Sequence, residues 1–336
     1  MSFTTGALHS PFPIDDASRV GEARRHAARL AVQCSMDDTA AGRLAIVVTE
    51  LGTNLLRHAR GGRLLIAGDA AQVEVIAIDD GPGMADTRLS MNDGFSTGGT
   101  SGNGLGAVRR LSQDFHMHSV PGEGTVIVAR VASGSAPRAK RGIRYGGVAT
   151  SAPGEIVSGD AWAVASEGPA ATLFVADGLG HGAFANQAAR EAIDAFRGQP
   201  VAQPREIIEV VHGALRSTRG AAVAALRADS TTETIDFCGA GNIIGRVVSG
   251  VTDRTMITQN GTAGLQVRRP EQHRVEWAAH AAIVVHSDGI ESRWTPERVR
   301  AVLGRDPVLM AAIVMRDHCR GRDDATVVVL TREAQA

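Results

Sequence analysis

The sequence is poor in aromatic residues, in cysteine and in excess charge. Aromatic residues make up 4% of its 336 positions, so its cores must be built mainly from Val, Ile, Leu and Ala. The three cysteines are odd in number, widely spaced and without CxxC spacing, which argues against a disulfide framework or a cysteine-based metal site. A formal net charge of −1 argues against a nucleic-acid partner bound through its phosphates.

Long apolar runs are also missing. No stretch approaches the roughly 20 apolar residues that a membrane helix needs, and no basic segment joined to an apolar one opens the sequence. With 43% apolar and 21% charged residues, the composition is typical of a globular protein. We therefore expect a cytoplasmic protein without a membrane partner, and its length allows two domains of ordinary size.

A polar and basic segment divides the chain. Residues 134–142 read Gly-Ser-Ala-Pro-Arg-Ala-Lys-Arg-Gly and lack helix or strand periodicity, as is typical of a linker. The motifs on its two sides differ in kind. We predict a first domain over residues 1–133, a linker over 134–142 and a second domain over 143–333. A surface loop within one domain is the alternative.

Helices precede strands in the first domain. Apolar residues recur at helical spacing over 16–33, with Asp15 or Asp16 as N-cap, and again over 38–59. Helices on one face of a mixed sheet would form a two-layer α/β sandwich. The other expected elements are strands over 63–67, 72–78 and 125–131 and a helix over 104–113.

Strands dominate the second domain, with pairs of helices between them. This order predicts two packed sheets covered by helix pairs, so the whole chain is expected to be a two-domain α+β protein. The expected strands are 145–150, 161–165, 172–176, 220–228, 231–237, 243–248, 281–286 and 326–330, and the expected helices are 183–196, 204–217, 296–303 and 306–319.

The first domain carries a candidate nucleotide site. Glu50 and Asn54 stand four residues apart on one helix face, which suits a general base beside a neutral oxygen ligand for Mg²⁺. Alone, this pair is more often a solvated helix face. Asp79 follows a strand directly and can accept a hydrogen bond from an adenine amino group, while Gly81 and Gly83 let the backbone approach the base.

A glycine-rich loop over residues 98–106 extends this site. It runs into a helix, whose N-terminus and backbone N–H groups would hold phosphates, although an isolated glycine-rich stretch is more often a flexible loop. Thr125 opens the last strand, and its hydroxyl could reach the same adenine. The residues assigned to the loop are Gly102, Gly104, Leu105 and Gly106.

These motifs, in this order, resemble the GHKL ATPases over about residues 10–131. No P-loop Gly-Lys-Ser/Thr occurs, which excludes that other kind of ATP site. The short spacing between the glycine motifs is most similar to the bacterial switch kinases of the RsbT type. The resemblance implies a Bergerat α/β sandwich that binds ATP and Mg²⁺ and phosphorylates Ser or Thr of a STAS-domain (anti-anti-sigma-like) protein. Glu50 would activate the acceptor hydroxyl, and Asn54 would hold the metal.

The second domain carries four acidic clusters, three of them at the ends of strand-like runs. Aspartates gathered without Lys or Arg repel one another, which favours divalent cations between them. Hydrolysis of phosphate monoesters is very slow without a catalyst, and two cations about 4 Å apart can activate water and clamp phosphoryl oxygens. Carboxylate ligands favour Mn²⁺ or Mg²⁺ over Zn²⁺. The expected ligands are Asp177 as the bridging carboxylate, the Gly178 carbonyl, Asp160, Asp288 and Asp323. Any one Asp-Gly pair is more often a turn.

The clusters resemble the SpoIIE/RsbX branch of the metal-dependent Ser/Thr phosphatases over nearly all of residues 144–331. The resemblance implies a four-layer αββα fold and phosphoserine or phosphothreonine protein substrates. Two points stay open. His181 either protonates the leaving seryl oxygen or supports the ligands by a hydrogen bond. Either Asp323 or Asp324 binds metal, and the family pattern favours the first.

The sequence thus predicts a bifunctional bacterial switch protein that phosphorylates and dephosphorylates a STAS-domain regulator. In one alternative, the first domain senses ATP or binds a sigma factor without transferring phosphate. In another, the phosphatase domain is the only working enzyme, and the first domain regulates it. A sigma factor and a downstream phosphatase are therefore further expected partners.

Overall fold

The computed structural model describes residues 1–336 except 60, 70–71, 88–90, 92–103, 135–141 and 333–336. The chain forms two compact units. The N-terminal unit is His9–Ala139, and the C-terminal unit combines Met1–Leu8 with Lys140–Ala336. Within the described ranges, no helix has the length and apolar character needed to cross a bilayer.

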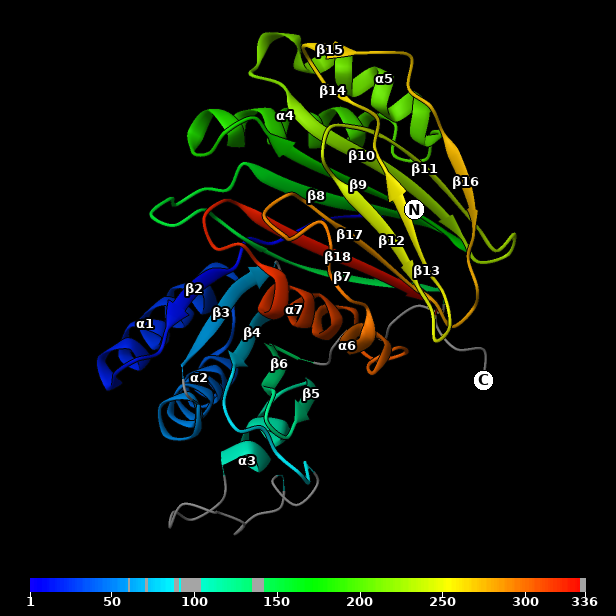
Figure 1. The fold of residues 1–336 in the computed structure, drawn as a ribbon. Coiled ribbons are helices and arrows are strands. Elements are labelled where there is room, and N and C mark those ends of the chain that lie inside the picture. Colours follow the sequence, from blue (N-terminus) through cyan, green and yellow to red (C-terminus); the bar gives the residue numbers. More distant parts are fainter. Residues whose placement is uncertain (60, 70–71, 88–90, 92–103, 135–141, 333–336) are drawn as a thin grey trace. The chain divides into compact units, whose positions relative to one another are not determined.

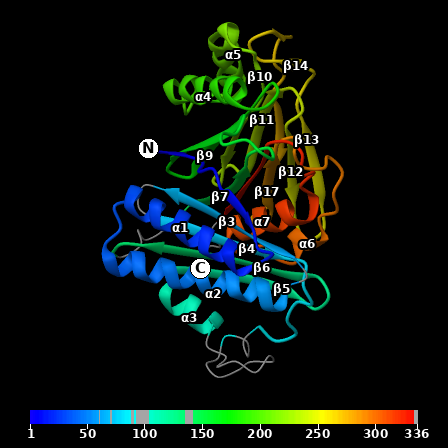
Figure 2. The same ribbon diagram turned by 90° about the vertical axis from the view of Figure 1, so that its left-hand side faces the viewer.

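The N-terminal unit is a sheet covered by helices on one face (Figure 2). The strand order is β2-β3-β4-β6-β5, and every described pairing is antiparallel, so the expectation of a mixed sheet is wrong. Neighbouring strands β3 and β4, and likewise β5 and β6, follow each other in sequence and pair as hairpins. The strands are β2 Ser10–Pro13, β3 Gly62–Asp69, β4 Gln72–Asp79, β5 Asp114–Val120 and β6 Gly124–Ala132; the helices are α1 Ala17–Gln33, α2 Asp38–His58 and α3 Gly104–Leu111.

Side-chain caps and small residues fix the two long helices of this unit. Asp16 caps α1 by accepting a hydrogen bond from the Ser18 N–H at 2.6 Å, as predicted for one of two aspartates. Asp37 caps α2 through the Ala40 N–H at 2.7 Å. The buried stripe of α1 is mostly alanine, so α1 packs closely on α2.

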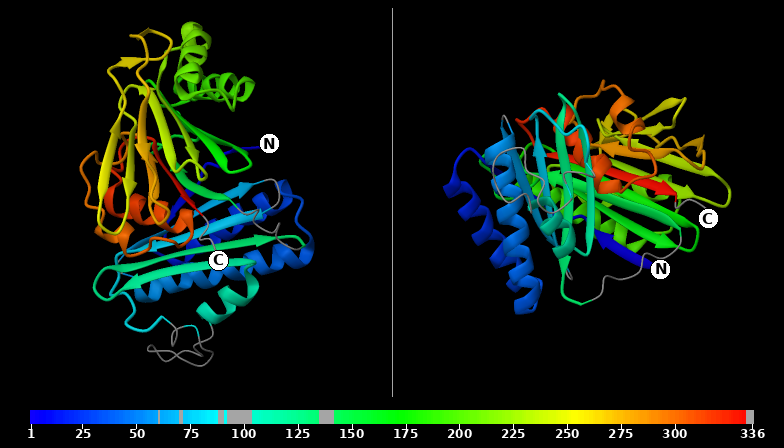
Figure 3. Two further views of the ribbon diagram at one scale, coloured as in Figure 1. Left: turned by 90° about the vertical axis from the view of Figure 1, so that its right-hand side faces the viewer. Right: turned by 90° about the horizontal axis from the view of Figure 1, so that it is seen from below.

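The C-terminal unit has four layers (Figure 1). A six-stranded sheet, β1-β8-β9-β10-β11-β16, faces a five-stranded sheet, β13-β12-β17-β18-β7. Helices α4 and α5 cover the first sheet, and α7 packs on β7 and β18 of the second (Figure 3). The predicted αββα arrangement is confirmed.

The elements of the C-terminal unit follow in sequence. The strands are β1 Ser2–Thr5, β7 Ile143–Thr150, β8 Asp160–Glu167, β9 Ala170–Gly178, β10 Ala221–Asp229, β11 Thr234–Ala240, β12 Ile244–Val248, β13 Asp253–Ile257, β14 Gly261–Thr262, β15 Gln266–Val267, β16 His273–Glu276, β17 Ala282–His286 and β18 Ala325–Arg332; the helices are α4 Ala183–Gly198, α5 Pro204–Ala214, α6 Glu297–Arg300 and α7 Pro307–His318.

Strand alternation builds two cores from few aromatic residues. In β8, Trp162 and Val164 belong to the core between the sheets, whereas Ala163 and Ala165 belong to the core under α4 and α5. Alanine is the commonest residue of the helix-side core, and Phe196 stacks on an aromatic ring of β9. Small side chains bring helix and sheet close together, which offsets the scarcity of large ones.

Strand β1 corrects the predicted start of the first domain. Residues 2–5 pair antiparallel with β8 and thus belong to the C-terminal unit, not to the first domain as predicted for residues 1–133. Phe3 packs on Phe196 with ring centroids 5.5 Å apart, and the Thr4 and Tyr145 hydroxyls are hydrogen-bonded at 2.9 Å. The chain therefore leaves the C-terminal unit after Leu8 and re-enters it at Lys140.

Candidate functional site

Carboxylates from two sheets gather in the C-terminal unit. Asp160 begins β8 and lies directly opposite Asp177, near the end of β9, in the antiparallel register. Asp288 follows β17 closely in sequence, and Asp323 precedes β18. Asp160, Asp288 and Asp323 each act on Asp177 through their charge. The predicted metal ligands are thus brought together. Their assignment as ligands stays a prediction.

Asp160 is buried and only half satisfied. Its Oδ2 accepts a hydrogen bond from the Ser287 hydroxyl at 2.6 Å, and the Ser287 Oγ in turn accepts one from the Thr326 N–H at 3.0 Å. These bonds join β8 of one sheet to the end of β17 and to β18 of the other. Its Oδ1 is buried and makes no hydrogen bond of normal distance and angle with the residues that the structure describes, although the nearby Thr326 hydroxyl lowers the pKa of Asp160. A buried carboxylate oxygen without a donor fits a position that faces a cation.

Burial and mutual repulsion raise the pKa of these carboxyl groups. Burial is the largest cause for both Asp160 and Asp177. The Ser287 and Thr326 hydroxyls partly oppose it at Asp160, and the neighbouring carboxylates raise the pKa of both groups. Burial and Asp323 also raise the pKa of Asp288, while the Arg320 guanidinium opposes this. All-oxygen ligands in a negative field suit Mg²⁺ or Mn²⁺, so the side chains present fit the expected ions.

The two adjacent aspartates before β18 differ in their surroundings. Asp324 is buried, and its two carboxylate oxygens accept hydrogen bonds from the Ala152 and Gly159 N–H groups, both at 2.8 Å. Asp323 is exposed, and its Oδ1 accepts from the Asp324 N–H at 2.9 Å. Both oxygens of Asp324 are therefore already used, which favours Asp323 as the metal ligand.

His181 lies in the loop between β9 and α4, four residues after Asp177. Its side chain is 64% exposed, and its Nδ1 lies 2.7 Å from the Glu155 carboxylate. Glu155, as a hydrogen-bond partner and as a charge, raises the pKa of His181. Sequence reasoning missed Glu155, because no motif marks it.

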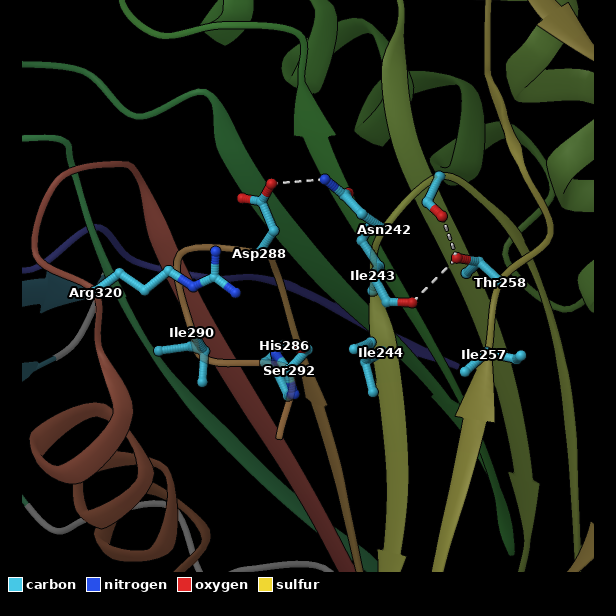
Figure 4. A pocket seen from close by; sticks show the side chains of 11 residues that line it. Asn242, Ile243, Ile244, Ile257, Thr258, His286, Asp288, Ile290, Ser292 and Arg320 are labelled. Atoms are coloured by element: carbon cyan, nitrogen blue, oxygen red, sulfur yellow. Dashed lines mark hydrogen bonds between the residues drawn. The ribbon is translucent and has the colours of Figure 1, made fainter. Parts of the chain in front are cut away.

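A pocket of about 350 Å³ is lined by Asp288, one of these carboxylates (Figure 4). Asn242, from the turn after β11, donates a hydrogen bond to Asp288 at 2.7 Å. Arg320, also missed by sequence reasoning, lines the pocket and is exposed, near Asp288. Much of the remaining wall is isoleucine from the turn before β12, from β12 and β13, and from the segment after β17: Ile243, Ile244, Ile257 and Ile290.

The N-terminal unit brings a second polar set together. Glu50 and Asn54 of α2 both face the start of α3, because a Cβ added at Gly104 would lie 3.0 Å from Glu50 Oε2 and 3.5 Å from Asn54 Oδ1. Asn54 Nδ2 is buried and finds no hydrogen-bond partner in the part of the chain that the structure describes. Leu105 and Gly106 lie in the first turn of α3. Gly102 lies outside the described residues.

The residues predicted to contact adenine lie close together at the end of β4. Asp79 lies opposite Thr125 in the β4–β6 register, and its Oδ1 accepts a hydrogen bond from the Gly81 N–H at 2.7 Å. Gly83 has φ +65, and a Cβ there would lie 2.0 Å from the Val120 carbonyl oxygen. Only glycine fits this close approach. These predicted residues therefore lie together, and nucleotide binding by them stays a prediction.

Family profiles match both parts of the chain. The profile described as "Histidine kinase-like ATPase domain" matches residues 12–131. The profile described as "Stage II sporulation protein E (SpoIIE)" matches residues 168–333. The two predicted family resemblances are confirmed.

Two curated proteins of Bacillus subtilis (strain 168) are similar to separate parts. "Serine/threonine-protein kinase RsbT" is 42% identical over 91 residues, covering 26% of this chain and 68% of RsbT. "Phosphoserine phosphatase RsbX" is 22% identical over 140 residues, covering 41% of this chain and 69% of RsbX.

Solved structures share the fold. One described as "The bacterial stressosome: a modular system that has been adapted to control secondary messenger signaling" is 26% identical with a TM-score of 0.53, covering 56% of this chain and 98% of that chain. "Crystal structure of RsbX in complex with magnesium in space group P1" is 19% identical with a TM-score of 0.51, covering 57% and 96%. The second likeness concerns the fold alone.

Proposed function

We propose that this protein phosphorylates another protein on Ser or Thr and removes that phosphate again. The chain belongs to the family of RsbT through its N-terminal unit and carries a SpoIIE domain in its C-terminal unit. The observation that carries the proposal is the gathering of Asp160, Asp177, Asp288 and Asp323 around a buried carboxylate oxygen without a donor. A similar kinase and a similar phosphoserine phosphatase support opposed activities in one chain.

The phosphatase activity is assigned to the C-terminal unit. Two Mn²⁺ or Mg²⁺ ions held by the four aspartates and the Gly178 carbonyl would activate a water and neutralise the phosphoryl oxygens. Ser287 holds Asp160 in place, and Asn242 holds Asp288. Arg320 places a positive charge in the adjoining pocket, where it would attract the dianionic phosphate group of a substrate.

The kinase activity is assigned to the N-terminal unit. ATP would bind between Asp79 and the start of α3, with its phosphates near Gly104. Asn54 would bind Mg²⁺, and Glu50 would accept the proton of the attacking Ser or Thr hydroxyl. The closeness of Glu50 and Asn54 to the helix start supports these roles.

The substrate we propose for both sites is a STAS-domain regulator in the cytoplasm. RsbT is a Ser/Thr protein kinase, RsbX is a phosphoserine phosphatase, and the description of one similar structure names the bacterial stressosome. Tethering the two activities would let their balance set the phosphorylation level of one shared partner.

Labelled ATP and a purified STAS-domain protein test this function. We expect the chain to label the partner in Mg²⁺ and to release the label when Mn²⁺ is added. Glu50→Ala should abolish labelling and preserve ATP binding, and Asp177→Asn should abolish release. Unchanged release by Asp177→Asn would overturn the metal assignment. A sigma factor retained in a pull-down, with no partner labelled, would favour the binding alternative for the N-terminal unit.

A further inference from the structure

Glu155 stands out because its carboxylate contacts His181, which closely follows the candidate metal ligands Asp177 and Gly178 in sequence. His181 Nδ1 and Glu155 Oε1 lie 2.7 Å apart. The two residues come from different segments, the loop after β9 and the irregular stretch before β8. Two flexible side chains on a surface seldom keep one geometry. This contact is therefore well ordered only if hydrogen bonds hold the backbone that carries Glu155.

The stretch 151–159 is fixed at both ends. Asp324 accepts from the N–H groups of Ala152 and Gly159, both at 2.8 Å, and so closes the stretch into a loop. Within it, the Ser151 hydroxyl donates to the Glu155 carbonyl at 2.9 Å. On the α4 side, Asn186 Nδ2 donates to the Ser158 carbonyl at 2.7 Å. Hydrogen bonds therefore hold the loop that carries Glu155 in one conformation.

The absence of a side chain at Gly182, next to His181, leaves space for the Glu155 carboxylate. Gly182 has φ +78, and a Cβ there would lie 3.2 Å from both Glu155 carboxylate oxygens. A side chain at position 182 would push Glu155 away from the ring. Gly182 is also the residue before α4, so the carboxylate lies near the positive end of that helix.

The charges around His181 favour a protonated ring. The Glu155 hydrogen bond is the largest cause that raises the pKa of His181, and Asp323 and Asp324 act in the same direction. Arg219 also lies beside this loop: its Nη1 is 3.6 Å from a Cβ built at Gly180, and its guanidinium covers the Phe184 ring at 4.8 Å. With Nδ1 engaged by Glu155, Nε2 is left to carry a transferable proton.

We propose that Glu155 is a positioning residue that holds His181 so that its Nε2–H protonates the leaving seryl oxygen. This inference rests on the proposed phosphatase function. The oxygen of the attacking water forms the new bond to phosphorus, and the bond from phosphorus to the seryl oxygen breaks. The seryl oxygen keeps the bonding electron pair and takes the Nε2 proton. The water's proton passes to solvent, from which His181 is reprotonated, and the products are a Ser hydroxyl and inorganic phosphate.

Leaving-group dependence tests the proposal. A seryl oxygen is a strong base that must be protonated as it leaves, whereas p-nitrophenolate leaves as a stable anion. With a phosphoserine peptide, Glu155→Gln should therefore lower kcat by about 10–100-fold, the order expected for losing part of a general acid. With p-nitrophenyl phosphate, kcat should stay within about twofold. The falling alkaline limb of the peptide kcat profile should move to lower pH, since His181 loses the carboxylate that keeps it protonated.

A double mutant shows whether Glu155 acts through the histidine. His181→Gln should have the same leaving-group selectivity, and adding Glu155→Gln to it should cost nothing further. Glu167→Gln, the same change at an exposed position at the end of β8, is the matched control and should change neither substrate's kcat. In Mg²⁺-loaded protein, NMR titration should place the His181 pKa lower in Glu155→Gln than in the control.

The outcomes separate this inference from the proposed function. Equal losses on both substrates, or additive losses in the double mutant, would show that Glu155 only stabilises the loop and would overturn the inference. Unchanged kcat on both would overturn it as well. Asp177→Asn should abolish hydrolysis of both substrates. If it hydrolyses both normally, the proposed metal site is wrong, whatever Glu155 does.

Discussion

At the scale of single residues, Asp323 and Asp324 have the same side chain and opposite surroundings. The sequence pattern could favour Asp323 as a ligand but could not exclude its neighbour. The distinction depends on two N–H groups in a distant stretch, which point at Asp324 only once β18 has paired with β7. Long-range backbone contacts of this kind leave no local signal.

The two positions should therefore respond differently to the same substitution. Asp324→Asn removes an acceptor from one of two buried N–H groups and should lower the free energy of unfolding of the C-terminal unit by about 1–3 kcal/mol. Asp323→Asn should leave the stability of the metal-free protein within about 0.5 kcal/mol and weaken Mn²⁺ binding. Denaturant titration and calorimetric Mn²⁺ titration measure the two effects. Strong destabilisation by Asp323→Asn would reverse the assignment.

The carboxylate cluster also predicts how stability depends on pH. An Asp whose pKa is raised in the folded protein keeps a proton that the unfolded chain has released, so the free energy of unfolding falls as pH rises through the raised values. Buried His286, whose pKa is lowered to about 4, contributes the opposite slope only at lower pH. The metal-free protein should therefore melt at a lower temperature at about pH 9 than at about pH 7.

Removing one of the clustered carboxylates tests whether their repulsion causes this pH dependence of stability. Asp177→Asn should raise the melting temperature of the metal-free protein at about pH 9 and abolish the further increase that Mn²⁺ gives to the unmutated chain. Asp194→Asn, at a position on α4 whose side chain is 71% exposed, is the control and should do neither. If Asp177→Asn lowers the metal-free melting temperature, repulsion is not what limits stability there.

At the scale of elements, periodicity predicted the long strands and helices and missed the short ones. The strands that flank the metal-ligand candidates, β8, β9, β17 and β18, lie where the apolar runs predict them. Strands β1 and β2 have four residues each, and β14 and β15 have two, too few for an alternation to be seen. β5 alternates around Met117, where His116 and His118 indicate a strand, but the sequence does not predict its full extent.

The start of α3 gives a prediction at this scale. A Cβ at Gly104 would lie 3.0 Å from Glu50 Oε2, so Gly104→Ala should displace Glu50 and Asn54. We expect autoradiographic labelling of the partner to fall at least about tenfold and phosphatase activity to stay unchanged. Gly42→Ala on α2, where a Cβ would meet nothing within 4 Å, should keep labelling and add up to about 1 kcal/mol of stability. Full labelling by Gly104→Ala would contradict a kinase site at this helix start.

At the scale of the whole molecule, the motifs separate two functions but do not reveal how the chain is divided between units. The motif sets lie on either side of a basic segment, so two consecutive domains were the natural prediction. The structure instead joins Met1–Leu8 to the C-terminal unit, leaving His9–Ala139 as an insertion with both ends covalently attached to that unit. The residues responsible, Ser-Phe-Thr-Thr, belong to no motif.

Two phenylalanines nine residues apart should therefore stabilise different units. Phe3 packs against Phe196 under α4, and Arg197 lies over its ring at 4.9 Å. Phe12 belongs to the core of the N-terminal unit and lies 5.1 Å from the His26 ring. Phe3→Ala should weaken the C-terminal unit and Phe12→Ala the N-terminal unit, each by about 1–3 kcal/mol because neither ring is fully enclosed.

Hydrogen exchange, measured peptide by peptide in the two variants, shows which unit each phenylalanine stabilises. Phe3→Ala should speed exchange in β8 and β9 and leave β3 and β4 unchanged, because β1 protects the edge of the six-stranded sheet. Phe12→Ala should do the reverse, so each variant serves as the other's control. If both variants loosened only β3 and β4, the first eight residues would belong with the N-terminal unit, and the domains would be consecutive after all.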